Sequence, residues 1–96
     1  MYARVATFEG GDLERIRQIN QERRNQPGWM PEGVKRVLVL NDHQSDKRHF
    51  ITFFDDRQAL DAASQQFEQM GDEIPEDVRG RRLGVDVYEV LADETV

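Results

Sequence analysis

The sequence predicts a single α+β domain, residues 1–96, with the element order β-α-β-β-α-β. Four segments are rich in the Val, Thr, Leu and aromatic residues that strands favour. Two longer segments repeat apolar residues at helical spacing. Right-handed crossovers in this order place both helices on one face of a four-stranded antiparallel sheet.

The first half of the chain is expected to form a strand, a helix and a second strand. Residues 2–8 suit the strand, which Gly10 and Gly11 end. Asp12 is placed to cap a helix that runs to about Asn25, before the breakers Pro27 and Gly28. The apolar stripe of this helix is Leu13, Ile16 and Ile19. A loop then leads into the second strand, residues 34–40.

The second half repeats the pattern in the order strand, helix, strand. A polar turn leads to a strand at 49–54, and Asp55 is placed to cap the following helix, with Gln58 three residues on. Gly71 is expected to end this helix, and residues 71–80 are expected to be irregular. The last strand spans about 81–91. The clearest helical stripe of the chain is Leu60, Ala63, Phe67 and Met70.

The predicted strands are apolar on both faces. Phe50 and Phe54 point to one side of the third strand, and Ile51 and Phe53 point to the other. Two helices cover only one side, and burying about six further side chains is worth on the order of 10 kcal/mol. We therefore expect a homodimer that packs through the uncovered sheet face. The alternative is that some of these positions lie at sheet edges and stay partly exposed.

Three segments resemble a known family. The hairpin Val34–Phe54, the run Phe50–Leu60 and the closing Val87–Val90 resemble the ferredoxin-like dimeric α+β barrel superfamily, within it the antibiotic-biosynthesis-monooxygenase-like (ABM-like) group. The resemblance covers nearly the whole chain. It implies a dimer whose two sheets form a barrel, with a pocket in each subunit between sheet and helices.

The resemblance also implies a function. Members include cofactor-free monooxygenases that act on aromatic polyketides or quinols, haem-degrading enzymes and isomerases. The Asn of the first strand and the His of the second helix that the haem-degrading type uses are absent here, and the single tryptophan, Trp29, falls in a loop. We therefore expect a protein that binds a small hydrophobic ligand, either as a cofactor-independent monooxygenase of an aromatic or quinol-like substrate or as a non-catalytic dimerisation or ligand-sensing module. Fold analogy alone adds a monomeric ferredoxin-like regulator.

Five residues are candidates for the site. His49 has a suitable pKa for a general base, or is simply a histidine at a strand end. Arg4 either binds an anion in the pocket or pairs with Asp86 or Glu89 of the last strand. Trp29 either closes over an aromatic ligand or packs on the end of the sheet. The remaining candidate ligand contacts are Phe53 and Phe54.

Composition excludes several other functions. The net charge of −6 argues against binding nucleic acid. There are no cysteines and no apolar run long enough to span a membrane, and the N-terminus has no signal-peptide pattern, so we expect a cytoplasmic protein. No metal or other cofactor is expected, because the only His and Asp cluster, around His43, matches no ligand spacing. The group Arg79, Arg81 and Arg82 either binds a phosphate or an acidic partner or is neutralised at the surface by nearby acids.

Overall fold

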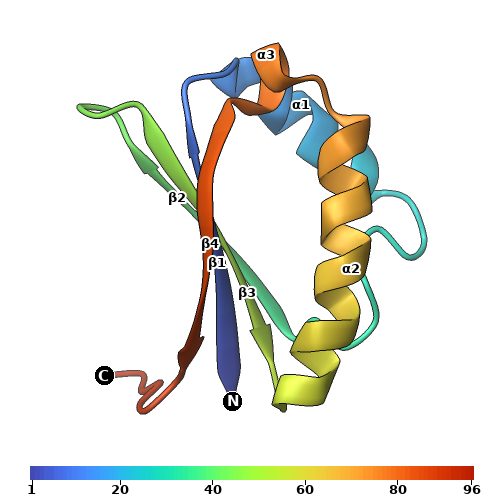
Figure 1. Ribbon diagram of the computed structural model, residues 1–96, viewed down its shortest axis with the longest axis vertical. Helices are drawn as coiled ribbons and strands as arrows, with labels where there is room; N and C mark the ends of the chain where they lie inside the picture. Colours follow the sequence, from blue (N-terminus) through green and yellow to red (C-terminus); the bar gives the residue numbers. More distant parts are fainter.

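The computed structural model describes residues 1–70 and 74–96 in full, together with the secondary structure of 71–73. It confirms the predicted β-α-β-β-α-β order and a four-stranded antiparallel sheet with strand order β2-β3-β1-β4. The sheet, with both long helices on one side, is shown in Figure 1. The elements are β1 Tyr2–Glu9, α1 Leu13–Arg24, β2 Arg36–Asp42, β3 Lys47–Phe54, α2 Arg57–Glu73, α3 Glu76–Arg79 and β4 Arg81–Glu89.

The N-termini of the two long helices are capped by side-chain carboxylates. The Oδ1 atom of Asp12 accepts from the backbone N–H of Arg15 at 3.1 Å, as predicted for the start of α1. The prediction that Asp55 caps α2 is wrong by one residue, since Oδ1 of Asp56 accepts from the N–H of Ala59 at 2.8 Å. Asp55 instead lies 3.5 Å from the ammonium group of Lys35.

The expected end of α2 at Gly71 is also wrong, because the helix runs to Glu73. A glycine inside a helix costs only about 1 kcal/mol relative to alanine, which does not end a helix that is favoured elsewhere. The segment expected to be irregular after it contains the short helix α3, which ends at Gly80.

The hairpin of β2 and β3 is longer than the sequence pattern predicted. Both strands extend into the polar segment, so that Asp42 pairs with Lys47 and only four residues form the turn. The carboxylate of Asp42 stabilises this turn by accepting from the backbone N–H of Gln44 at 2.9 Å and the hydroxyl of Ser45 at 2.8 Å.

The strand register separates two faces of the sheet. Ala6 lies directly opposite Phe50, and this pair faces the helices. Val5 lies opposite Ile51, and this pair faces away from them. The packed core lies between α2 and the helix side of the sheet, and consists of Phe54, Leu60, Ala63 and Phe67.

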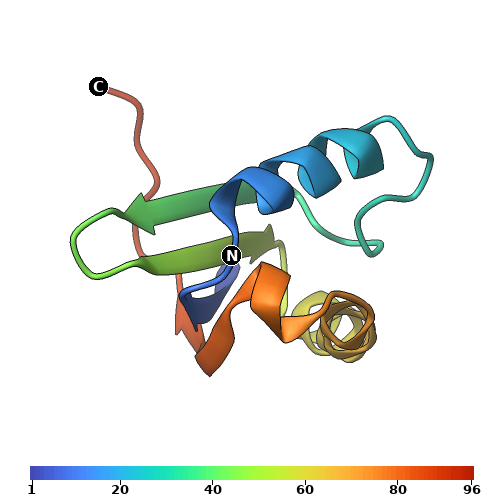
Figure 2. The same ribbon diagram turned by 90° about the horizontal axis from the view of Figure 1, so that it is seen from above.

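The two long helices differ in how they pack. α2 buries Leu60, Ala63 and Phe67 against the sheet. α1 buries none of its residues, although Ile16 and Ile19 are apolar. Viewed from above, the helices run in clearly different directions on the same side of the sheet (Figure 2). The space between sheet, α1 and α2 is therefore not filled by the core.

The opposite face of the sheet is apolar and uncovered in this subunit. Val5, Leu38, Ile51 and Phe53 are only half-buried there, and Tyr88 is 56% exposed. This confirms the prediction that the strands are apolar on both faces.

Two turns fix one end of the molecule. The N–H of Asp12 donates to the carbonyl of Val78 at 2.9 Å, which ties the start of α1 to α3. Gly80, at φ 87°, lies against this turn so closely that a Cβ atom there would be 2.7 Å from the carbonyl oxygen of Glu9. Arg79 precedes Gly80 directly, and Arg82 follows it by two residues. The close contact at Gly80 therefore constrains the backbone that carries both arginines.

Candidate functional site

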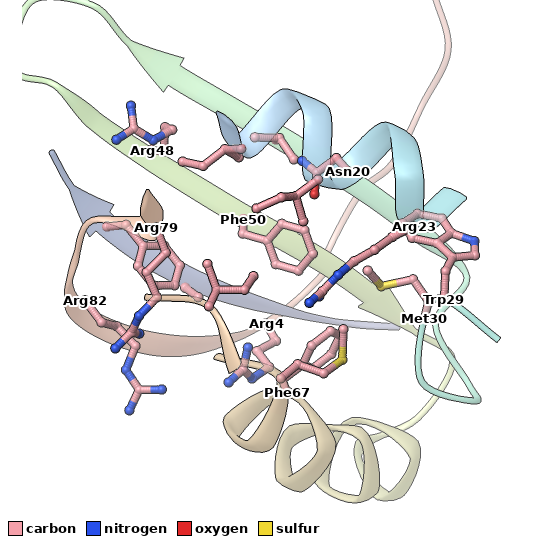
Figure 3. A pocket seen from close by; sticks show the side chains of 17 residues that line it. Arg4, Asn20, Arg23, Trp29, Met30, Arg48, Phe50, Phe67, Arg79 and Arg82 are labelled. Atoms are coloured by element: carbon pink, nitrogen blue, oxygen red, sulfur yellow. The ribbon is translucent and has the colours of Figure 1, made fainter. Parts of the chain in front are cut away.

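A cavity of about 160 Å³ lies between the sheet, α1 and α2. Its floor is the helix side of the sheet, to which all four strands contribute, and alternate residues of each strand share this face. β1 contributes Arg4, Ala6 and Phe8, and β3 contributes Arg48 and Phe50. The side chains that line the cavity are drawn in Figure 3.

The other walls come from the helices and from the loop before β2. Ile16 and Ile19 of α1 line the cavity on the side opposite the sheet, together with Trp29 and Met30 of the loop. Phe67 of α2 closes another side, and its ring meets Phe50 edge-on, with 6.0 Å between centroids. The apolar stripe of α1 thus faces the cavity instead of a packed core, which explains why α1 buries no residue.

The cavity has the size and lining of a site for a small aromatic molecule. A closed apolar cavity of about 150 Å³ is enough to bind benzene. Most of the side chains lining this one are aliphatic or aromatic, with a few polar groups among them. Binding sites for small molecules typically have this composition.

The polar groups of the lining are almost all arginines. No described Asp or Glu residue is among the lining side chains, although the chain has 19 acidic and 13 basic residues. As far as the described side chains show, the lining is therefore basic, although the protein as a whole is acidic. The five arginines are Arg4, Arg23, Arg48, Arg79 and Arg82.

Arg4 is almost completely buried and is paired with a carboxylate of α2. Its Nη2 atom lies 3.3 Å from Oε1 of Glu68, and its guanidinium lies 4.9 Å from the ring centroid of Phe67. Burial lowers the pKa of Arg4, and the charge of Glu68 opposes that effect. The predicted partners Asp86 and Glu89 on β4 are wrong, because Glu68 supplies the carboxylate. Asp86 lies opposite Val5 and so points to the other face of the sheet.

Glu68 also binds Arg82. Both of its carboxylate oxygens accept from Nη1 of Arg82, at 2.7 and 2.6 Å. This hydrogen bond, and the positive charges of Arg82, Arg4 and Arg79, hold the pKa of Glu68 below its ordinary value. Glu68 therefore remains ionised and orients two arginines of the cavity.

Arg48 is the second buried arginine of the floor, with 4% of its surface exposed. Its Nη1 atom donates to Oδ1 of Asn41 at 3.3 Å and to Oδ1 of Asp46 at 3.4 Å. Its Nε and Nη2 atoms are buried, and no residue in the described part of the chain accepts a hydrogen bond from them.

The five candidates from the sequence are placed in three different regions. Arg4 and Trp29 line the cavity. His49 lies on the far face of the sheet, where Nδ1 shares a hydrogen bond of 2.9 Å with the hydroxyl of Thr7. Phe53 is on that same face, and Phe54 is fully buried in the core. Roles of His49, Phe53 and Phe54 in chemistry or ligand contact remain predictions, without support from their positions.

The sequence reasoning missed Arg48. It lies two residues before Phe50 on the same strand face, so the alternation that pointed to Arg4 would also have found it. It was missed because the third strand was expected to begin only at residue 49. Arg23 was missed because it lies in the polar last turn of α1.

Neither a metal cluster nor a membrane helix is found in the described residues. No group of three His, Asp or Glu side chains is arranged to hold an ion there. The helices described are all too short or too polar to cross a bilayer. The cytoplasmic location stays a prediction.

The comparisons with known proteins identify the fold. No protein-family model and no curated protein matches the sequence. A solved structure from Chloroflexus aurantiacus, assigned provisionally as an antibiotic biosynthesis monooxygenase, matches with a TM-score of 0.61 and 11% identity over 98% of this chain and 96% of that chain. A structure from Deinococcus radiodurans with the same provisional assignment matches with a TM-score of 0.54 and 14% identity, over 100% and 98% of the two chains.

A third structure, Rv0793 from Mycobacterium tuberculosis, matches with a TM-score of 0.56 and 15% identity over 98% of both chains. At sequence identities this low, the structural matches establish a common fold and no common activity. The chain therefore has the ferredoxin-like α+β fold of the ABM-like structures, and the resemblance seen in its sequence is confirmed at that level.

Proposed function

We propose that this protein, as one domain of residues 1–96, is a homodimer that binds an aromatic or quinol-like molecule between the sheet and the helices of each subunit. The observation that carries the proposal is the position of α1. Its apolar residues Ile16 and Ile19 face a cavity and not a packed core. A helix face that is apolar and unpacked is stabilised when a hydrophobic ligand covers it.

The dimer is proposed to form through the far face of the sheet. Val5, Leu38, Ile51 and Phe53 form an apolar surface there that the helices of the same subunit do not cover. Exposed apolar surfaces of this kind are rare in monomers and typical of interfaces. Packing on this face leaves the cavity on the other side of the sheet accessible.

Oxidation of the bound molecule by molecular oxygen is the catalytic form of this proposal. The arginines favour it, because positive charge lowers the pKa of a bound hydroquinone, and its phenolate gives up electrons to oxygen more readily. In a balanced reaction one oxygen atom replaces a ring hydrogen as a hydroxyl group. The other leaves as water with the two hydroxyl hydrogens, and the ring becomes a hydroxyquinone. The provisional assignments of the Chloroflexus aurantiacus and Deinococcus radiodurans structures, which share this fold, also support this reaction class.

A non-catalytic ligand-sensing module is the second candidate. The observation that favours it is the chemistry of the lining, whose described polar side chains are those of Asn20 and the arginines. Amide and guanidinium side chains are not among the usual general bases, so the described part of the lining supplies none. In the catalytic form the substrate itself has to lose its proton to water.

The first experiment measures binding. Trp29 is the only tryptophan and lines the cavity, so its fluorescence reports on a ligand there. We expect alkyl-substituted hydroquinones, kept under argon, to change this fluorescence in a saturable way. Trp29→Phe removes the signal, and calorimetry on that variant checks that binding persists. Absence of saturable binding by both methods would contradict the proposal.

The second experiment separates the two candidates. Oxygen uptake is followed with the same hydroquinones in air, against a control without protein. Uptake above the spontaneous rate, with one hydroxyquinone formed per oxygen consumed, supports the monooxygenase. Saturable binding without any additional uptake supports the sensing module.

A further inference from the structure

The cavity floor contains buried cationic groups that lack acceptors. Arg4 and Arg48 are 3% and 4% exposed, and within the described residues nothing accepts from Nε of Arg4 or from Nε and Nη2 of Arg48. Buried donors are nearly always paired in folded proteins, since an unpaired one loses its hydrogen bonds to water without compensation. In folded proteins such donors are paired with ordered water or with a bound molecule, and both arginines line the cavity in which a ligand would lie.

The free atoms of Arg48 form one complete edge of its guanidinium group. The N–H groups of Nε and Nη2 point in the same direction, and this edge binds both oxygens of a carboxylate in the bidentate arrangement typical of arginine. The other end of the group is held by Asn41 and Asp46 through Nη1. These contacts orient the guanidinium and leave its carboxylate-binding edge unused.

A second subunit on the far face of the sheet does not reach this edge. Arg48 lies opposite Phe8 and beside Phe50, on the side of the sheet that faces the helices. The dimer proposed above uses the opposite side. Arg48 is also one of the side chains that line the cavity, so a molecule bound there is the acceptor that we consider for it.

Arg4 and Arg48 start from well-separated positions on the floor of the cavity. In the register, Arg4 pairs with Thr52 and Arg48 pairs with Phe8, four residues further along β1. Four residues of a strand span about 13 Å. The pair of Ala6 and Phe50 lies between the two arginines and forms an apolar surface of about the length of one substituted ring.

The charges around the two arginines differ. Arg4 is paired with Glu68, which also binds Arg82. Arg48 has only the neutral Asn41 and a long contact of 3.4 Å to Asp46, whose side chain is 67% exposed and therefore well screened by water. The uncompensated positive charge of the floor is thus greatest at Arg48.

We propose that the ligand of the cavity is an aromatic acid, whose carboxylate binds the Nε and Nη2 edge of Arg48 while its ring lies over Ala6 and Phe50. This inference rests on the proposed ligand-binding function and specifies the chemical class of the ligand. The arginines of the lining make an anionic ligand favourable even though the whole chain carries a net charge of −6.

The test compares two probes of nearly the same shape, the anionic 4-propylbenzoate and the neutral 4-propylbenzamide, in which an NH2 group replaces one acceptor oxygen, at pH 7 and low ionic strength. Binding is measured by calorimetry and by Trp29 fluorescence. We expect the acid to bind at least roughly tenfold more tightly than the amide, as a charge-assisted bidentate contact implies. Equal affinities would overturn the inference and leave the ligand-binding function standing. Binding of neither probe would overturn both.

Variants of Arg48 locate the carboxylate. Arg48→Gln is expected to reduce the affinity for the acid about tenfold or more and to change that for the amide less than about twofold. Arg48→Lys keeps the charge but loses the two-donor edge, and is expected to recover only part of the affinity. Arg17→Gln, at an exposed position outside the cavity lining, is the matched control for net charge and is expected to change neither.

Circular dichroism shows whether each variant is folded. If Arg48→Gln does not fold, the comparison of the two probes on the unaltered protein still decides the question. A folded Arg48→Gln that retains the full preference for the acid would place the carboxylate elsewhere and overturn the assignment to Arg48.

Discussion

The Nη2 atom of Arg4 lies 3.3 Å from Oε1 of Glu68, which pairs a buried cation of the sheet with a half-exposed carboxylate of α2. Because Glu68 also binds Arg82 on β4, the same carboxylate connects three elements around the cavity. This arrangement makes the stability of the protein, and the position of two arginines, depend on the ionisation of one residue.

The first prediction concerns the pH dependence that Glu68 introduces. Its pKa is lower in the folded protein than its ordinary value of 4.5, so its contribution to stability is full above that value and is lost as the pH falls through the folded pKa. Glu68→Gln should therefore cost on the order of 1 kcal/mol at pH 7 and less at pH 3. Urea unfolding at both pH values measures this, with the exposed Glu22→Gln as control. An equal cost at both pH values would contradict the ionic role of Glu68.

The second prediction concerns Gly80, which holds the arginine-bearing turn against β1. An alanine there has a positive φ and a Cβ atom 2.7 Å from the carbonyl oxygen of Glu9, so we expect Gly80→Ala to cost about 1–3 kcal/mol. Gly84→Ala is the matched control, since nothing lies within 4 Å of a Cβ atom at that position. It should change the stability by less than about 0.5 kcal/mol. Thermal unfolding of both variants tests the difference, and equal losses would refute it.

The third prediction tests the sheet-face dimer. Ile51 lies opposite both Val5 and Leu38 in the middle of the far face. Ile51→Lys would place a charge in the proposed interface, so we expect light scattering to report a monomer at concentrations where the unaltered protein is a dimer. Gln65→Lys, on the exposed side of α2, adds the same charge and should leave the dimer intact. A monomeric unaltered protein at high concentration would exclude this interface.

The fourth prediction concerns the buried hydroxyl group of Thr52. This side chain is fully buried, and its Oγ1 atom has no hydrogen-bond partner within the described residues. Thr52→Val keeps the shape and removes the unpaired group, so we expect it to raise the free energy of unfolding by about 1 kcal/mol. The same change at Thr7, whose hydroxyl bonds to His49, should bring no such gain. A loss of stability in Thr52→Val would mean that the hydroxyl has a partner.

The order of the elements and the two apolar faces of the sheet could be predicted from the sequence because they depend on local patterns. The stripe of Leu60, Ala63 and Phe67 follows the helical period, and the alternation of Phe50, Ile51 and Phe53 follows the strand period. Element ends were less predictable, since two adjacent residues, Asp55 and Asp56, can both cap a helix and only the chain geometry selects one.

The geometry of the site could not be predicted from the sequence, because it depends on contacts between residues that are far apart along the chain. Arg4 and Glu68 are 64 positions apart, and nothing local distinguishes Glu68 from Asp86 as the partner of Arg4. The composition predicted an acidic protein, while the fold gathers arginines from α1, the sheet and the turn at Gly80 around one cavity. The sequence by itself determined which side of each strand is apolar, because backbone periodicity fixes side-chain direction. The tertiary structure alone decided which charges meet, because that depends on how strands pair and helices cross.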